Sequence, residues 1–314
     1  MKELLEKYTR KTRKWTDICV IAAFLTFILI LLGQLVGDVF SALMRSHIDK
    51  NPVSEISLMY FDFIGIWMVF LPILCLKGNR PMFHFLATNK KKLGNNWRGI
   101  LWGIGIGFGM NAFCAIVSIL HKDIHITFDC FEPLNLLMIF LCVLVQSGAE
   151  ELGCRLYLLN KLTRRYKSPW FCIVANSVLF SALHLLNPGI KFMAIVQIIL
   201  VGILFSIMTL YYDSFYAAAF AHTSWNFTQN ILFGLPNSGI VSPYSMFMLD
   251  TAKNGPCFDT EFGIEGSIGA CLVMAAVIIF LVVRLRQRNQ SPVDIWAERE
   301  RKLLAEQNKE VTQE

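Results

Sequence analysis

The sequence predicts an all-α fold, a polytopic bundle of about eight transmembrane helices. Hydrophobic residues make up 55% of the 314 residues and charged residues 17%, and the mean hydropathy is +0.50. That balance is typical of a multi-pass membrane protein rather than a soluble enzyme. Several apolar runs are about 18 residues or longer, which is enough to cross a bilayer. Lys and Arg are gathered in alternate connecting segments, which fits an even number of spans.

The expected spans follow one another from near Ile18 to residue 284. The first apolar run is too long for a signal-peptide core and lacks a small-residue cleavage site, so we expect an uncleaved span there. The fifth and seventh spans are short and carry polar residues. The spans after the first are expected at 56–76, 97–120, 134–160, 169–186, 190–211, 215–233 and 263–284.

The orientation follows from the basic residues in the short flanking segments. Segments poor in Lys and Arg are 45–55, 121–133, 187–191 and 234–262. Segments rich in them are the N-terminal arm, 77–98, 161–167 and the tail after Arg284. The positive-inside rule places the basic segments, and therefore both termini, in the cytoplasm. Topology and anionic lipid account for this basic charge, so a nucleic-acid partner is not expected.

The chain divides into segments with different expected roles. A core that carries the polar motifs is flanked by accessory spans, an outer loop, a last span and charged ends. The boundaries are 1–14 for the basic arm, 15–125 for three accessory spans, 126–233 for the core, 234–262 for the extracytoplasmic loop, 263–285 for the last span and 286–314 for the cytoplasmic tail.

The nine cysteines do not form a disulfide or zinc framework in the sequence. Most of them fall inside or at the ends of apolar runs, where a cysteine acts as a small apolar residue. No CxxC pair or Cys/His cluster with zinc-ligand spacing occurs. Cys130 and Cys257 share the predicted outer side, so a disulfide between them stays open.

The most informative stretch is Gln146-Ser-Gly-Ala-Glu-Glu-Leu-Gly-Cys-Arg155, which places three charges inside an apolar run. An ionised side chain in hydrocarbon costs a few kcal/mol or more, so these groups must face a paired or hydrated interior. Glu151 and Arg155 are spaced i, i+4 in the favourable order and are expected to pair. Glu150 lies about 100° around the helix from Glu151, free to point into a site.

Two later spans each carry a histidine within an apolar run, in Phe180-Ser-Ala-Leu-His184 and His222-Thr-Ser-Trp-Asn226. The i, i+4 spacing places both residues of each pair on one helical face. Phe180 is expected to pack beneath His184 and hold its ring, and Asn226 to share a target with His222.

A structural role is the alternative for each of these polar groups, because a single buried histidine is more often a packing residue than a catalyst. However, Glu150, Glu151, His184 and His222 lie on three spans and all must avoid lipid. We therefore expect them to converge on one interior site. Counting from the predicted span ends at about 1.5 Å per residue, this site should lie within the membrane, nearer the cytoplasmic half.

Taken in order, the three motifs resemble those of the CPBP family of intramembrane proteases. That family includes type II CAAX prenyl endopeptidases and bacterial proteins linked to bacteriocin processing and self-immunity. The resemblance covers roughly residues 130–233. The residues that carry it are Glu150-Glu151-xxx-Arg155, Phe180-xxx-His184 and His222-xxx-Asn226.

The resemblance implies an intramembrane endopeptidase that acts on a peptide or protein substrate in the cell membrane, and it does not establish a prenylated one. In such a protease Glu150 and His184 would activate water, and His222 and Asn226 would stabilise the oxyanion. This mechanism requires no cofactor. Glu150, His184 and His222 also match the ligand types of a hydrolytic zinc site, so zinc stays open as an alternative.

Two other classes of function compete with the protease. In an ion-coupled transporter, Glu150 and Glu151 would relay protons or bind ions together with Asp38 and Asp62. In a non-catalytic immunity or scaffold protein, the same site would bind a partner without cleaving it. Peptide cleavage, substrate flux, or neither in reconstituted protein distinguishes the three.

Overall fold

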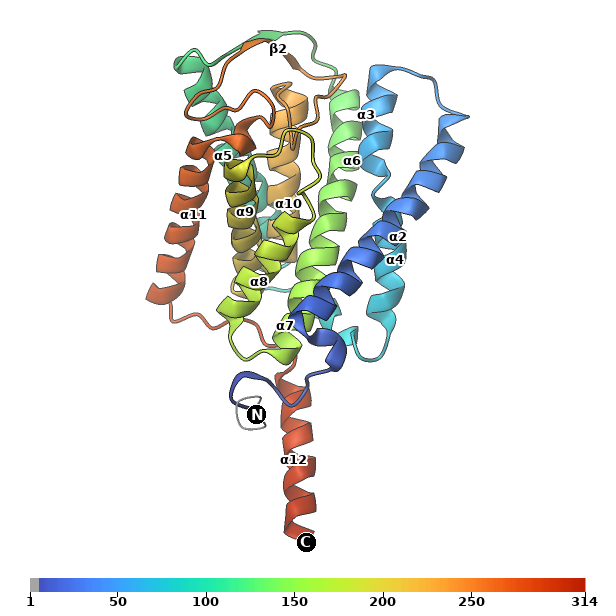
Figure 1. Ribbon diagram of the computed structural model, residues 1–314, viewed down its shortest axis with the longest axis vertical. Coiled ribbons are helices and arrows are strands. Elements are labelled where there is room, and N and C mark those ends of the chain that lie inside the picture. Colours follow the sequence, from blue (N-terminus) through green and yellow to red (C-terminus); the bar gives the residue numbers. More distant parts are fainter. Residues whose placement is uncertain (1–5, 314) are drawn as a thin grey trace.

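The computed structural model describes residues 6–313. It shows a bundle of long helices with a small sheet at one end (Figure 1). Residues 1–5 of the expected N-terminal arm, and residue 314 of the expected tail, lie outside the described residues. Both ends of the described part of the chain lie at the end of the bundle opposite the sheet.

Each of the eight expected spans is largely helical. Among the described helices, six are long and apolar enough to cross a membrane: α2 (Cys19–Arg45), α3 with α4 (Pro52–Phe61 and Ile64–Cys75), α5 (Trp97–Leu120), α6 through α7 (Pro133–Glu151 and Leu159–Arg165), α9 (Phe192–Leu210) and α11 (Ile268–Gln287). The two short spans are α8 (Pro169–Ala182) and α10 (Phe215–Phe227). The chain is therefore a multi-pass membrane protein, as predicted.

Two π-helical segments extend the helices that carry the motifs. The first, η3 (Leu152–Leu158), joins α6 to α7 and follows Glu150 and Glu151 directly. The second, η4 (Thr228–Leu232), continues α10 just beyond Asn226. Such segments are rare in helices and frequently accompany functional sites.

The ends of two spans differ from the prediction. The fourth helix continues to Arg165 instead of ending near residue 160. The fifth stops at Ala182 instead of residue 186, so His184 lies on the turn that follows α8. A helical conformation is disfavoured before a proline, and Pro188 is followed by Gly189 with a φ of 71°. These two residues redirect the chain towards α9.

Glycines let α5 approach α10 closely. A Cβ on Gly103 would meet the carbonyl oxygen of Ala217, and one on Gly107 would meet that of Ala221. Gly103 and Gly107 thus form a close helix contact through small residues, whereas a Cβ on Gly105 would meet nothing within 4 Å. The contact fixes the position of α10, which carries His222 and Asn226.

The connecting segments at the sheet end are joined to one another. Strand β1 (Ile124–Phe128) pairs antiparallel with β2 (Phe247–Ala252), and the short helix η5 (Ile264–Gly266) precedes α11. All nine cysteines are free, so Cys130 and Cys257 are not linked. At the opposite end lie η1 (Trp15–Asp17), η2 (Arg80–Phe85) and α12 (Ala297–Gln313). The common location of the termini fits an even number of crossings (Figure 1), and their cytoplasmic placement stays a prediction.

Candidate active site

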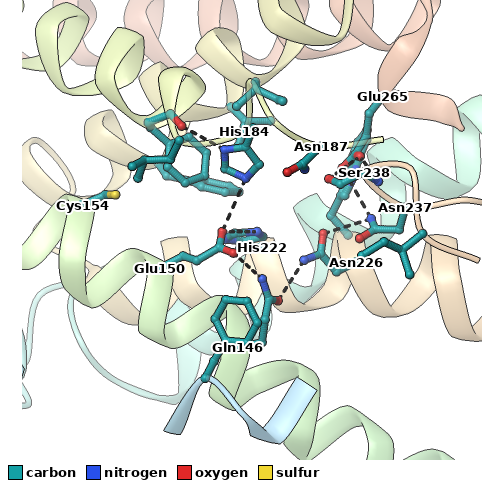
Figure 2. Close-up of a pocket in the computed structure, with 18 of the residues that line it drawn as sticks. Gln146, Glu150, Cys154, His184, Asn187, His222, Asn226, Asn237, Ser238 and Glu265 are labelled. Atoms are coloured by element: carbon teal, nitrogen blue, oxygen red, sulfur yellow. Dashed lines mark hydrogen bonds and ion pairs between the residues drawn. The ribbon is translucent and has the colours of Figure 1, made fainter. Parts of the chain in front are cut away.

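A cavity of about 310 Å³ lies inside the bundle and gathers the motif residues. Figure 2 shows polar side chains converging on it from α6, α10 and three connecting segments. Much of the remaining wall is apolar, with contributions from α2, α4 and α9. The labelled polar residues are Gln146, Glu150, His184, Asn187, His222, Asn226, Asn237, Ser238 and Glu265.

Both imidazoles turn their Nε2 atoms towards the same carboxylate oxygen. Oε2 of Glu150 lies 4.0 Å from Nε2 of His184 and 3.7 Å from Nε2 of His222. These separations are longer than a direct hydrogen bond, and a water molecule can bridge such gaps. The Glu150 and His184 side chains are 18% and 16% exposed, so the group can be reached from outside the protein.

The backbone determines the tautomer of His184. Its Nδ1 lies 2.9 Å from the carbonyl oxygen of Phe180. A carbonyl oxygen only accepts, so Nδ1 carries the hydrogen, and Nε2 of the neutral ring is an acceptor that faces Glu150. The ring of Phe180 also packs edge-on against His184, with centroids 4.8 Å apart. The turn after α8 thus presents a lone pair to the cavity.

Glu151 connects His222 to Arg155. Its Oε1 lies 3.0 Å from Nδ1 of His222 and 3.0 Å from Nη1 of Arg155. The expected pair with Arg155 is therefore present, and the contact with His222 was not expected. Because a carboxylate accepts, Nδ1 of His222 donates to it, which orients Nε2 towards Glu150.

Two aromatic rings enclose the buried guanidinium of Arg155. The guanidinium carbon lies 4.1 Å from the centroid of Phe180 and 5.5 Å from that of Phe205. Phe205 also stacks on His222, with centroids 5.4 Å apart. Cation–π contacts of this kind stabilise a desolvated cation by about 2 kcal/mol. They accompany the Glu151 pair in holding a charge that is fully buried.

A chain of side-chain amides begins at Glu150. Nε2 of Gln146 donates to Oε1 of Glu150 at 2.6 Å. Nδ2 of Asn226 donates to Oε1 of Gln146 at 3.2 Å. Nδ2 of Asn237 donates to Oδ1 of Asn226 at 3.3 Å and to Oε1 of Glu265 at 3.5 Å. The chain thus runs from one carboxylate to another through three amides (Figure 2).

The two carboxylates dictate how each amide in this chain is oriented. An ionised Glu150 only accepts, so Gln146 must present its NH₂ group to it and its oxygen to Asn226. The same reasoning turns the NH₂ group of Asn226 towards Gln146 and its oxygen towards Asn237. Glu265 is held in turn by Trp225 Nε1 at 3.1 Å and by the backbone N–H of Ser238 at 2.7 Å.

The structure thus brings together the predicted site residues, with one difference. Glu150, His184 and His222 face one another, and Glu151, Arg155 and Phe180 support them. Asn226 lines the same cavity, but its amide points to Gln146 rather than to the target of His222. The role of Gln146 was not predicted, although its i, i+4 spacing to Glu150 places the two side chains on one helical face. The positions of Asn237 and Glu265 follow only from the folded loop, which left no signal in the sequence.

The residues as placed do not form a zinc site. Zinc bonds of 2.0–2.2 Å in tetrahedral geometry separate two ligand atoms by about 3.4 Å, whereas Glu150 lies 4.0 Å and 3.7 Å from the two Nε2 atoms. Within residues 6–313, no group of three His, Cys, Asp or Glu side chains is arranged to hold a metal ion.

The four carboxylates that an ion-coupled transporter would use do not lie together in the structure. Glu150 lines the cavity, whereas Glu151 is fully buried behind it. Asp38 and Asp62 are not part of the cavity wall, and Asp62 instead accepts a hydrogen bond from Ser41 at 2.5 Å. The four groups therefore do not line one continuous path.

These features define a multi-pass helical membrane protein with a carboxylate–imidazole site in a cavity enclosed by its helices. Residues 132–228 match the family model described as type II CAAX prenyl endopeptidase Rce1-like. The resemblance expected from the three motifs is thereby confirmed over this segment, which contains all of them. At the family level, the match supports a CAAX-protease-like intramembrane endopeptidase.

A curated relative extends the similarity beyond the motif segment. The chain is 24% identical over 253 residues to a Bacillus subtilis (strain 168) protein described as uncharacterized protein YyaK. The alignment covers 77% of this chain and 80% of the relative. No solved structure matches the chain.

Proposed function

We propose that this protein is an intramembrane endopeptidase that hydrolyses a peptide bond with a water molecule activated by Glu150 and His184. The observation that supports this most directly is the convergence of two Nε2 atoms on Oε2 of Glu150, at 4.0 Å and 3.7 Å. Acceptors on both sides of a gap can each take one hydrogen of a water molecule, which leaves its oxygen free to attack.

The reaction proceeds through a tetrahedral intermediate. As the water oxygen attacks the carbonyl carbon of the substrate, Glu150 takes one of its protons and later returns it to the leaving amine. The hydrogen bond from Gln146 holds the Glu150 carboxylate in place, and the Phe180 carbonyl holds the imidazole of His184.

Donors on α10 stabilise the oxyanion. In its protonated form His222 donates from Nδ1 to Glu151 and from Nε2 into the cavity. Asn226 has two N–H donors, and the one towards Ser147 spans 3.5 Å, so it is only weakly engaged. Rotation of the whole planar amide of Asn226 brings this N–H towards the developing negative charge. Losing one such donor typically lowers kcat by about 100- to 1,000-fold.

The proposal is tested with purified protein in proteoliposomes and a peptide library, with cleavage read by mass spectrometry. We expect cleavage by the wild-type protein and a loss of at least about 100-fold in Glu150→Gln. Asp62→Asn is the matched control, because it neutralises another carboxylate of the spanning segments outside the cavity wall. Normal cleavage by Glu150→Gln contradicts the proposed mechanism. Ion-coupled flux without cleavage identifies a transporter, and neither activity identifies a binding protein.

A further inference from the structure

The walls of the cavity are unevenly distributed along the bundle. Its lining residues come from the parts of α9 and α10 towards the sheet end, from α6 around Glu150, and from the segments that contain Asn187, Ser238 and Ile240. Among the described residues, none of the lining comes from the basic segments 77–98 and 161–167. The cavity therefore approaches the end of the bundle that lies away from the termini (Figure 1).

Packed side chains close the cavity on the side of the termini. Cys154, Phe180 and Phe205 form its floor, and each is at most 2% exposed. Beyond this floor the bundle is tightly packed. The last residues of α9 and the turn that follows it, residues 206–212, are all buried. A peptide therefore has no open path to Glu150 from that side.

The residues that line the cavity are more exposed towards the sheet end of the bundle. Ile240 is 43% exposed, and Gln34, Asn187 and Ser238 are half-buried. These four residues line the cavity and come from α2, the turn after α8 and the loop after η4. They define a mouth at the outer half of the bundle, which we call the Ile240 mouth.

Glu150 lies farther from the cytoplasmic end of its helix than the sequence predicted, because the fourth helix continues beyond residue 160. Because α7 ends at Arg165, Glu150 lies roughly 22 Å along the helix from its basic end, at about 1.5 Å per residue. The sequence-based estimate assumed an end near residue 160 and placed the site closer to the cytoplasm. Lys and Arg at 77–98 and 161–167 assign the closed side to the cytoplasm.

We infer that the site is approached from the extracytoplasmic side, through the Ile240 mouth. The substrate class is then a peptide segment presented at the outer half of the membrane, not the C-terminus of a cytoplasmic protein. Ile30, Phe63 and Val201 on the cavity wall suit apolar side chains of such a segment, and Asn187 and Asn237 suit its backbone groups. This inference rests on the proposed function for the identity of the substrate, but the side of access is independent of it.

Cysteine labelling measures the side of access without any proteolysis. Cys19, Cys75, Cys130 and Cys142 are replaced by Ser, because they are exposed or half-buried, and the five buried cysteines stay. Ile240→Cys or Asn187→Cys is then introduced singly, and a membrane-impermeant maleimide is added to intact cells or to inside-out vesicles. The control is the same protein with Cys75 restored, since Cys75 is exposed at the end of α4 on the side of the termini.

We expect the maleimide to label Ile240→Cys and Asn187→Cys in intact cells, and Cys75 only in inside-out vesicles. Labelling of the mouth positions only in inside-out vesicles, or of all three positions from one side, overturns the inference. In proteoliposomes of known orientation, cleavage should occur when peptide is supplied to the face that carries Ile240. Absence of cleavage from both faces contradicts the proposed function and leaves the labelling result unchanged.

Discussion

Oε1 of Glu151 lies 3.0 Å from Nδ1 of His222, and the same oxygen accepts a hydrogen bond from Arg155. Glu151 therefore both orients a cavity imidazole and balances a fully buried guanidinium. Removal of one partner of a buried ion pair leaves an uncompensated charge and costs about 3–5 kcal/mol. The two roles of Glu151 can be separated because the guanidinium can be removed independently.

We predict that Glu151→Gln lowers the free energy of unfolding by about 3–5 kcal/mol, because Arg155 loses its counter-charge. The double variant Glu151→Gln/Arg155→Met should regain much of this loss, since Met fills the space between Phe180 and Phe205 without a charge. It should not regain proteolysis, because His222 still lacks its carboxylate partner. Thermal unfolding in detergent and a peptide cleavage assay measure the two effects. Recovery of both stability and cleavage would show that Glu151 acts only on Arg155.

Gln146→Leu tests the amide chain. The substitution removes the 2.6 Å hydrogen bond to Glu150 and the acceptor of Asn226. We predict that kcat falls by about 10- to 100-fold with a small change in KM, because both groups act in the transition state. The matched control is Asn111→Leu, which removes a buried amide pair with Gln229 outside the cavity wall. It should reduce stability and leave kcat unchanged. Equal effects of the two variants on kcat would assign Gln146 a structural role.

The membrane class and the convergence of the motifs could be predicted because both follow from the cost of charge in lipid. Apolar runs identified the spans, and intramembrane Glu150, His184 and His222 had to face inward. Helix ends were less predictable. The fifth span appeared to include His184, but α8 ends at Ala182 and His184 lies on the turn that follows it. The local apolar pattern did not show this.

The rest of the site depends on tertiary packing. Asn237 and Glu265 reach the cavity from a loop and from η5, which are distant in sequence from the motifs. The contact between Glu151 and His222 requires α6 and α10 to lie side by side. Helical periodicity within one segment does not predict which two helices are neighbours. The side on which the cavity opens depends on where side chains fill the space between the helices.

Chelation tests the metal-free mechanism. We predict that a strong zinc chelator leaves cleavage unchanged, because Glu150 and the two imidazoles are held by Gln146, the Phe180 carbonyl and Glu151 rather than by a metal. The measurement compares cleavage rates after prolonged incubation with chelator, followed by dialysis and addition of zinc. Loss of activity that zinc restores would assign Glu150, His184 and His222 as metal ligands.

The short helix η1, which follows the N-terminal arm, is attached to α7 by a buried carboxylate that predicts a pH dependence of stability. Asp17 pairs with Arg164, with Oδ1 2.5 Å from Nη2, and with Lys161 at 3.2 Å. Burial alone would raise the pKa of Asp17, but Arg164 and Lys161 outweigh it, so the pKa lies below its ordinary value of 3.8. A depressed pKa means that the pair stabilises the fold above pH 3.8 and loses this contribution as the pH falls through the folded-state pKa.

We therefore predict that Asp17→Asn lowers the free energy of unfolding by about 3 kcal/mol at pH 7. The difference from the wild type should begin to shrink as the pH falls below 3.8, because the Asp17 carboxyl of the unfolded chain then binds protons, and it should disappear once the folded-state carboxyl is protonated as well. Thermal unfolding in detergent at a series of pH values between 3 and 7 measures this gap. Asp294→Asn is the control, since Asp294 pairs with Arg10 at a partly exposed site, where an ion pair contributes about 0–1 kcal/mol. A gap for Asp17→Asn that stays constant across this range would show that the Asp17 carboxylate does not stabilise the fold through its charge.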